Sequence, residues 1–203
     1  TNMGDMFNGC TSLTTIPLLD TSNVTDMISI FAYCKNLTTI PLLDTSNVTD
    51  MRAMFENCTN LTTIPLLNTS SVTTMRTMFY GCTNLATIPL LNASKVTDMR
   101  HMFYNCTSLA LTELPSGITS IGNYAFYGCT SLALTSLPSG VTSIGNLAFY
   151  RCASLALTSL PSGLTSIGES AFERCTNLAL TSLPSGLTSI GEYAFRQCTS
   201  LAI

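Results

Sequence analysis

The sequence predicts a solenoid that is rich in β-structure and short helical turns, a curved right-handed stack of about nine repeats of 23–24 residues. The first observation is a set of nine cysteines spaced 24 residues apart four times and then 23 residues apart four times. The second is a set of nine phenylalanines, each three residues before a cysteine. One repeat of this length cannot bury its apolar face, whereas stacked repeats can. The cysteines are Cys10, Cys34, Cys58, Cys82, Cys106, Cys129, Cys152, Cys175 and Cys198.

Composition is the third observation. Only 9% of the 203 residues are charged and 46% are hydrophobic, while 32 Thr and 23 Ser replace the missing charge; a typical soluble domain is about 25% charged. A net charge of −3 argues against a nucleic-acid binder, and no apolar run approaches the roughly 18 residues of a membrane span. A single histidine argues against most histidine-dependent catalysis. We therefore expect no enzyme, no cofactor, no nucleic acid partner and no membrane insertion.

The repeat changes type once, near Cys106. Residues 1–106 form 24-residue, Met-rich repeats, and residues 107–203 form 23-residue repeats with LPSG and SIG motifs. No linker separates the two halves, so we expect one continuous body. The sequence begins and stops within a repeat and lacks the polar caps that solenoids need. We therefore expect a piece of a longer chain, whose open sheet edges could pair end to end.

Each repeat begins, after its cysteine, with a predicted short strand. Leu37, Ile40 and Leu42 have the spacing of such a strand, in which Ile40 and Leu42 share one face. Proline lacks an N–H and is normally excluded from central strands. Because Pro41 recurs once per repeat in eight repeats, it must mark a strand end or a bulge.

The remaining elements of the repeat follow in order. A turn rich in Asx or Gly residues, such as the one that starts at Asp44, comes next. Apolar side chains, such as Val141 and Ile144, are then expected to point inward a second time. The segment before the cysteine, such as residues 51–57, is predicted to form a single helical turn with Phe55 packed inward.

Two patterns resemble known surface proteins. L-P-S-G-x-T-S-I-G-x-x-A-F-x-x-C at Leu137–Cys152 resembles the main repeat of the BspA-like leucine-rich-repeat surface proteins of bacteria. M-F-x-x-C-x-x-L-x-x-I-P-x-x-x-T-S-x-V-T-x-M at Met54–Met75 resembles the companion repeat of the same proteins and of mycoplasma surface lipoproteins. The C-terminal repeats depart from the family pattern by one position at Leu134.

The resemblance implies a leucine-rich-repeat solenoid on a secreted or cell-surface protein, in a family associated with adhesion. The implied function is non-catalytic adhesion or protein interaction through one repeat face. The implied partner is a host extracellular-matrix or cell-surface protein, or a glycan. The alternative is a structural spacer in a surface or phage protein, with no ligand of its own.

Tyrosine follows the repeated phenylalanine in four consecutive repeats. Residues stacked about 5 Å apart would form an aromatic stripe across the junction between the repeat types. Tyrosine is enriched at binding sites because it offers rigid area and a hydroxyl group. The hypothesis is a stripe that contacts a protein or glycan; the alternative is stacking for stability alone. With the arginines nearby in sequence, the candidate binding residues are Tyr80, Tyr104, Tyr127, Tyr150, Arg76, Arg100 and Arg151.

An arginine column offers a second candidate surface. Arg52, Arg76 and Arg100 stand three residues before the repeated phenylalanine and would repel one another unless paired or solvated. Asp50 and Asp98 are two residues away and could relieve the repulsion. The alternatives are a solvated face and an anion site for a sulfated glycan.

Three other patterns have structural interpretations that we favour. The cysteine spacing lacks the C-x-x-C of metal sites, and we expect buried thiols rather than reactive or bridging ones. The Asp20 and Asp44 column is interpreted as turn capping, with weak Ca²⁺ binding as the alternative. The threonine columns, such as Thr39, suit a solvated strand, with ice binding as the alternative; strand alternation would place Thr38 and Thr39 on opposite faces.

Overall fold

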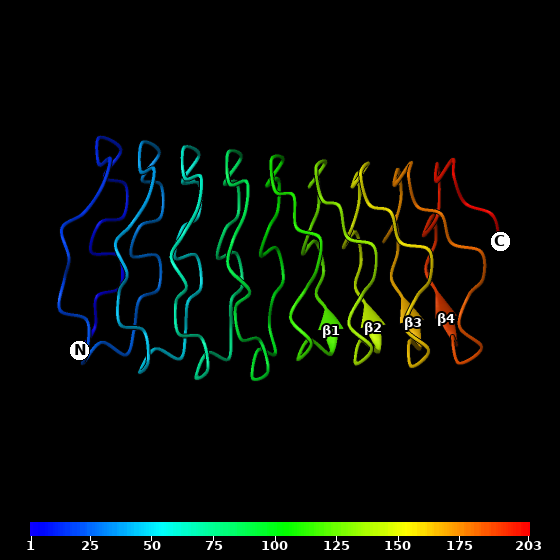
Figure 1. Cartoon of the computed structure of the whole chain (residues 1–203), viewed down its shortest axis with the longest axis horizontal. Coiled ribbons are helices and arrows are strands. Elements are labelled where there is room, and N and C mark those ends of the chain that lie inside the picture. Colours follow the sequence, from blue (N-terminus) through cyan, green and yellow to red (C-terminus); the bar gives the residue numbers. More distant parts are fainter.

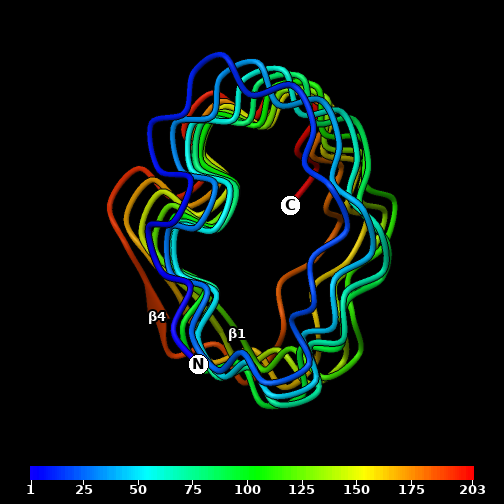
Figure 2. The ribbon, with the colours of Figure 1, turned by 90° about the vertical axis from the view of Figure 1, so that its left-hand side faces the viewer.

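The repeats stack in a single row. The computed structural model describes all residues from Thr1 to Ile203. The chain passes from repeat to repeat without crossing back, so its termini lie at opposite ends of the row (Figure 1). Viewed along the row, the repeats follow one shared outline that encloses the core (Figure 2). The predicted solenoid is confirmed.

A narrow parallel sheet runs along one side of the stack. It consists of β1 (Ser120–Ile121), β2 (Ser143–Ile144), β3 (Ser166–Ile167) and β4 (Ser189–Ile190), in that spatial order. Serine pairs with serine and isoleucine with isoleucine across every strand pair. In the N-terminal half, isolated parallel bridges join successive repeats at Asn2, Asp26, Asp50, Thr74 and Asp98. The sheet therefore forms in the segment whose apolar side chains, such as Ile144, point inward for the second time in the repeat.

The strand predicted at Leu37–Leu42 is wrong. Ile40 is 4% exposed, but Leu42 is 61% exposed and Leu43 takes the buried position at 2%. Proline offers no donor here, and one backbone hydrogen bond joins this segment to the preceding repeat, from the Thr38 amide to the Thr14 carbonyl at 3.2 Å. One bond per repeat does not hold a strand, and the segment stays extended but irregular.

The helical turn predicted at residues 51–57 is also wrong, since the structure contains no helix. Backbone bonds alternate along this segment. The amides of Ala53, Phe55 and Asn57 donate to the next repeat at 2.6–3.0 Å, whereas those of Met54, Glu56 and Cys58 donate three residues back at 3.1–3.3 Å. In an α-helix, by contrast, every amide would donate to a carbonyl of its own segment, four residues back. The tertiary bonds to the neighbouring repeat therefore replace helical ones.

This alternation requires two residues per repeat in the left-handed region, five and one positions before each cysteine. Ala53 and Asn57, for example, have φ values of 55° and 56°. The pattern holds in all nine repeats, and only Gly9, Gly81 and Gly128 are glycines. A left-handed non-glycine residue costs about 1–2 kcal/mol, so interactions between repeats must hold these turns.

The phenylalanines form a stack through the whole core. Successive rings lie 5.1–5.7 Å apart between centroids and are inclined by 3–17°. The seven from Phe31 to Phe172 belong to one apolar cluster of 53 buried residues that runs through both repeat types, and Phe7 and Phe195 pack against its two ends.

The cysteines form a column of free thiols beside the phenylalanines. Seven of the nine are buried, while Cys198 is half-buried and Cys10 is exposed. Each Sγ from Cys34 onward donates to the phenylalanine carbonyl of the preceding repeat at 2.9–3.0 Å. The prediction of buried thiols is confirmed.

These thiols predict a loss of stability at alkaline pH. Burial raises the pKa of Cys58 to about 12 and that of Cys198 to about 11, and raises the pKa of Cys106 well above its usual value. An unfolded thiol ionises near pH 8.5, so above that pH the unfolded state releases protons that the folded state keeps. Each thiol then lowers the free energy of unfolding by about 1.4 kcal/mol per pH unit until its folded-state pKa is reached.

The expected result is a urea midpoint that is level from pH 6 to 8 and falls from about pH 9 upward. Cys106→Ala removes one buried thiol and should therefore reduce the loss of stability per pH unit, whereas Cys10→Ala, at an exposed position, should leave that loss unchanged. Equal slopes in the parent chain and the Cys106→Ala variant would contradict the assignment.

Candidate functional site

The four predicted tyrosines form one continuous stack. Tyr80 and Tyr104 lie 4.6 Å apart between ring centroids, Tyr104 and Tyr127 4.5 Å, and Tyr127 and Tyr150 4.8 Å, with planes inclined by 2–13°. Their backbone is set by bonds between repeats, such as the one from the Gly81 amide to the Tyr104 carbonyl at 2.7 Å. Each ring is half-buried, so part of every tyrosine faces solvent.

A second aromatic column lies beside this stack. The rings of His101 and Tyr124 are 4.7 Å apart and inclined by only 10°. Tyr124 also meets Tyr104 and Tyr127 at 6.4 and 6.0 Å, in tilted contacts of 45° and 43°. We refer to Tyr80, Tyr104, Tyr127, Tyr150, His101 and Tyr124 as the aromatic platform.

Sequence reasoning missed the second column. His101 and Tyr124 stand three residues before Tyr104 and Tyr127 and are both left-handed, with φ values of 57° and 58°. The turn in the backbone brings side chains three positions apart to the same surface. A spacing of three between aromatic residues in successive repeats was the available signal.

The platform is neutral over its rings. Burial, followed by the charges of Arg76 and Arg100, lowers the pKa of His101, which favours the uncharged imidazole. Its Nδ1 is buried and has no hydrogen-bond partner. Positive charge lies at the margin instead, where the Arg151 guanidinium sits 5.3 Å from the centre of the Tyr150 ring.

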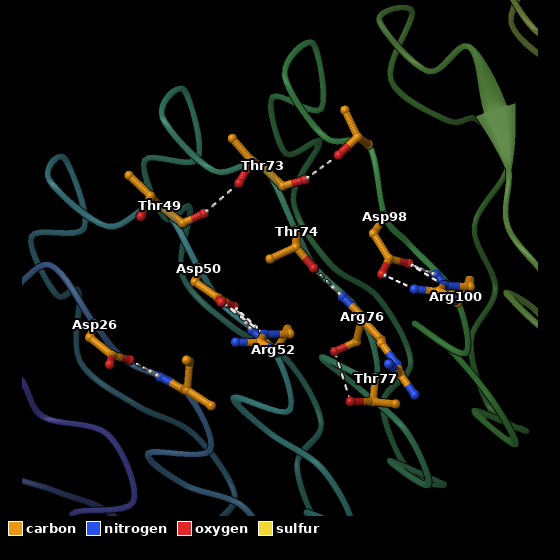
Figure 3. Close-up of polar contacts among 12 residues, drawn as sticks. Asp26, Thr49, Asp50, Arg52, Thr73, Thr74, Arg76, Thr77, Asp98 and Arg100 are labelled. Atoms are coloured by element: carbon orange, nitrogen blue, oxygen red, sulfur yellow. Dashed lines mark hydrogen bonds and ion pairs between the residues drawn. The ribbon is translucent and has the colours of Figure 1, made fainter.

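Arg52, Arg76 and Arg100 lie in successive repeats (Figure 3), and Arg100 directly precedes His101 of the platform. Arg52 pairs with Asp50 at 2.8 Å and Arg100 pairs with Asp98 at 2.7 Å. The hydrogen bond from Arg100 lowers the pKa of Asp98. These pairs are exposed, so they relieve repulsion more than they stabilise the fold.

Arg76 is the exception in this column. The position equivalent to Asp50 and Asp98 in its repeat is Thr74, which accepts only a long backbone bond of 3.5 Å from the Arg76 amide. The guanidinium of Arg76 has no ion-pair partner and lies between two paired arginines (Figure 3). The column therefore carries one uncompensated positive charge near His101.

A polar groove follows the sheet in the C-terminal half, and sequence reasoning missed it too. Its cavity volume is about 510 Å³, and 12 of its 16 lining residues are not hydrophobic. We call it the serine groove because the serines of β1–β4 line it together with the glycines that follow β1, β2 and β3. Ser143 Oγ donates to Ser120 Oγ at 3.0 Å. A floor of hydroxyl groups and bare backbone can exchange hydrogen bonds with a hydroxyl-rich or extended ligand.

The aspartate columns cap turns, as expected. Asp20 Oδ1 accepts a bond from the Ser22 amide at 3.1 Å, and Asp44 Oδ1 accepts one from the Ser46 amide at 2.9 Å. The hydrogen bonds from the Ser22 side chain and amide lower the pKa of Asp20. Nowhere do three or more His, Cys, Asp or Glu side chains converge as metal ligands would.

Thr38 and Thr39 are both exposed, and the segment that carries them is not a strand. The regular alternation of side chains that would place them on opposite faces therefore does not apply here.

Comparison with known proteins places the chain in a family. Residues 97–203 match the family described as BspA type leucine rich repeat region, in six copies, and residues 1–114 match the family described as mycoplasma protein of unknown function, DUF285. No curated protein matches. No helix that is long and apolar enough to cross a membrane occurs in the structure.

Solved structures of similar proteins come from several bacteria. A leucine-rich repeat protein of Bacteroides ovatus is 28% identical with a TM-score of 0.72, over 97% of this chain and 56% of that one. The Treponema pallidum leucine rich repeat protein, TpLRR, is 28% identical with a TM-score of 0.57, and the match covers 92% of this chain and 76% of that one. A leucine rich cell surface protein of Faecalibacterium prausnitzii is 28% identical with a TM-score of 0.54, and the match covers 98% of this chain and 67% of that one. This chain thus spans little more than half of the B. ovatus protein. With both halves matched, the chain belongs to the BspA-type leucine-rich-repeat proteins and carries a DUF285 region in its N-terminal half.

Proposed function

We propose that this chain is a non-catalytic binding module of an extracellular or cell-surface protein, and that it engages a host protein or glycan through the aromatic platform. The observation that carries the proposal is the platform itself, with four stacked tyrosines and a second aromatic column against them. Support for the location comes from the F. prausnitzii relative, which is named a cell surface protein.

The composition of the platform suits a binding surface. Tyrosine and arginine are enriched at interfaces and among the residues that dominate binding energy. The stacked rings are already fixed by their neighbours, so a ligand would order few side chains on binding. Arg151 and the unpaired Arg76 border the rings and could meet acidic groups of a host protein or the sulfates of a glycan.

The test is the binding of the 203-residue chain to a panel of extracellular-matrix proteins and glycans. Tyr104→Ser combined with Tyr127→Ser removes the centre of the platform. We expect saturable binding by the parent chain and at least tenfold weaker binding by this variant, with folding checked by circular dichroism.

Tyr33→Ser is the matched control. Tyr33 is 43% exposed and donates to Glu56 Oε1 at 2.9 Å, outside the platform. Equal binding by the double variant and the control would show that the platform is not the binding site. A double variant that is less stable but binds normally would show that the tyrosines only stabilise the stack.

A spacer is the second candidate function. The observation in its favour is the single apolar cluster of 53 residues, which links all repeats into one rod. A well-folded parent chain that binds no member of the panel would favour the spacer, in which the function resides elsewhere in a longer protein.

A further inference from the structure

An apolar pocket lies at the seam between the two repeat types. Its cavity volume is about 210 Å³, and 12 of its 17 lining residues are hydrophobic. It shares no residue with the aromatic platform and only Met99 with the serine groove. We call it the seam pocket.

A slip in the repeat pattern creates the pocket. In the 24-residue repeats, the apolar residues stand three, six and nine positions after the cysteine; in the 23-residue repeats they stand three, five and eight positions after it. At the seam, Ile88 therefore meets Leu111 and Leu114, which belong to the other pattern. Ile88 and Leu111 are only half-buried, whereas their equivalents within the two repeat types, Ile64 and Leu134, are 3% and 0% exposed.

A small side chain enlarges the space. Ala93 occupies the position held by Thr45 and Thr69 in the two preceding repeats. Those threonines are buried, and their hydroxyl groups donate to the next repeat's carbonyl at 2.8 and 2.9 Å. Ala93 is itself 5% exposed and lines the pocket. The missing hydroxyl and methyl group leave room and remove a polar contact at the same point.

We propose that the seam pocket binds a small aromatic ring of about the size of indole, and that it favours a ring carrying an amine. An apolar cavity of about 150 Å³ stays dry and binds benzene, and the seam pocket is larger at about 210 Å³. Glu113 is the one charged residue in its lining, and it is exposed. A carboxylate there attracts an ammonium group on the ligand and repels a carboxylate.

The absence of tryptophan makes the test direct. Since the chain contains none, indole fluorescence excited beyond the tyrosine band reports on the ligand alone. Titrating indole with the 203-residue chain should shift its emission to the blue, with a dissociation constant of about 1 mM or below. No shift at millimolar protein would overturn the proposal.

Filling the pocket should abolish binding. Ala93→Ile and Ala110→Leu both add carbon atoms at lining positions, and each should weaken indole binding at least tenfold. Ala86→Leu is the matched control, because Ala86 is four residues after its cysteine, as Ala110 is, but lies outside the pocket. Thermal unfolding of each variant shows whether it is folded. The proposal fails if Ala110→Leu and Ala86→Leu bind indole equally, or if Ala93→Ile is folded and still binds.

The rim carboxylate is tested with two charged indoles. Tryptamine should bind at least threefold more tightly than indole-3-acetate, and Glu113→Gln should remove the difference. Equal affinities for the parent chain would overturn the preference for an amine. This inference is independent of the platform, since the Tyr104→Ser, Tyr127→Ser variant should bind indole normally.

Discussion

Phe126→Ala is expected to lower the free energy of unfolding by about 3–5 kcal/mol. The Phe126 ring is fully buried, with centroids 5.1 Å from Phe103 and 5.3 Å from Phe149. Truncation removes both contacts and leaves a cavity that neighbours fixed by their own repeats cannot fill. Because each repeat contacts only its neighbours, a defect in the middle of the stack should also divide unfolding into two transitions.

The measurement is urea unfolding followed by circular dichroism, with hydrogen exchange to locate the first repeats to open. Phe195→Ala is the matched control, since Phe195 is half-buried and stacks on Phe172 alone at 5.5 Å. Its cost should be less than half that of Phe126→Ala, with one transition retained. Equal costs would show that the phenylalanine stack does not transmit stability between repeats.

The same stacking explains why the sequence predicts the columns well. In a solenoid, residues one repeat apart become neighbours in space, so a period in the sequence translates directly into a column. The phenylalanine stack, the buried thiols and the row from Tyr80 to Tyr150 all follow from this translation. No knowledge of the backbone within a repeat was needed for any of them.

The elements within a repeat were predicted poorly for a related reason. The pattern around Leu42 suggested a strand, and residues 51–57 suggested a helical turn, because both interpretations weigh local preference. In the structure about half of the backbone bonds run between repeats, and in residues 51–57 they take every second amide away from its own segment. Tertiary bonding therefore overrides local propensity here.

The missed parts of the site depend on geometry that residue preference does not encode. His101 and Tyr124 join the platform because both adopt left-handed backbone, which is uncommon for any residue other than glycine. The seam pocket depends on a mismatch between two repeat types, and a period within either type does not show its size.

The second large effect is expected from Gly168→Ala, which should lower the free energy of unfolding by about 3 kcal/mol. A Cβ atom at Gly168 would lie 2.5 Å from the Asn146 backbone nitrogen and 2.6 Å from the Gly145 carbonyl carbon. Both atoms belong to the backbone of the preceding repeat, which cannot move without breaking the bond from the Gly168 amide to the Ile144 carbonyl at 2.8 Å. The glycine thus permits the close approach of two repeats under the serine groove.

Gly163→Ala provides the control, because a Cβ atom at Gly163 would meet nothing within 4 Å. That change should leave stability unchanged or raise it by up to about 1 kcal/mol through the unfolded chain. Comparing the urea midpoints of the two variants separates the effect of the Cβ contact in the folded state from the effect of alanine on the flexibility of the unfolded chain. Similar midpoints would mean that the neighbouring repeats can move apart by the width of a methyl group. A large loss confined to Gly168→Ala would establish that backbone contact sets the spacing of the 23-residue repeats, and with it the floor of the groove.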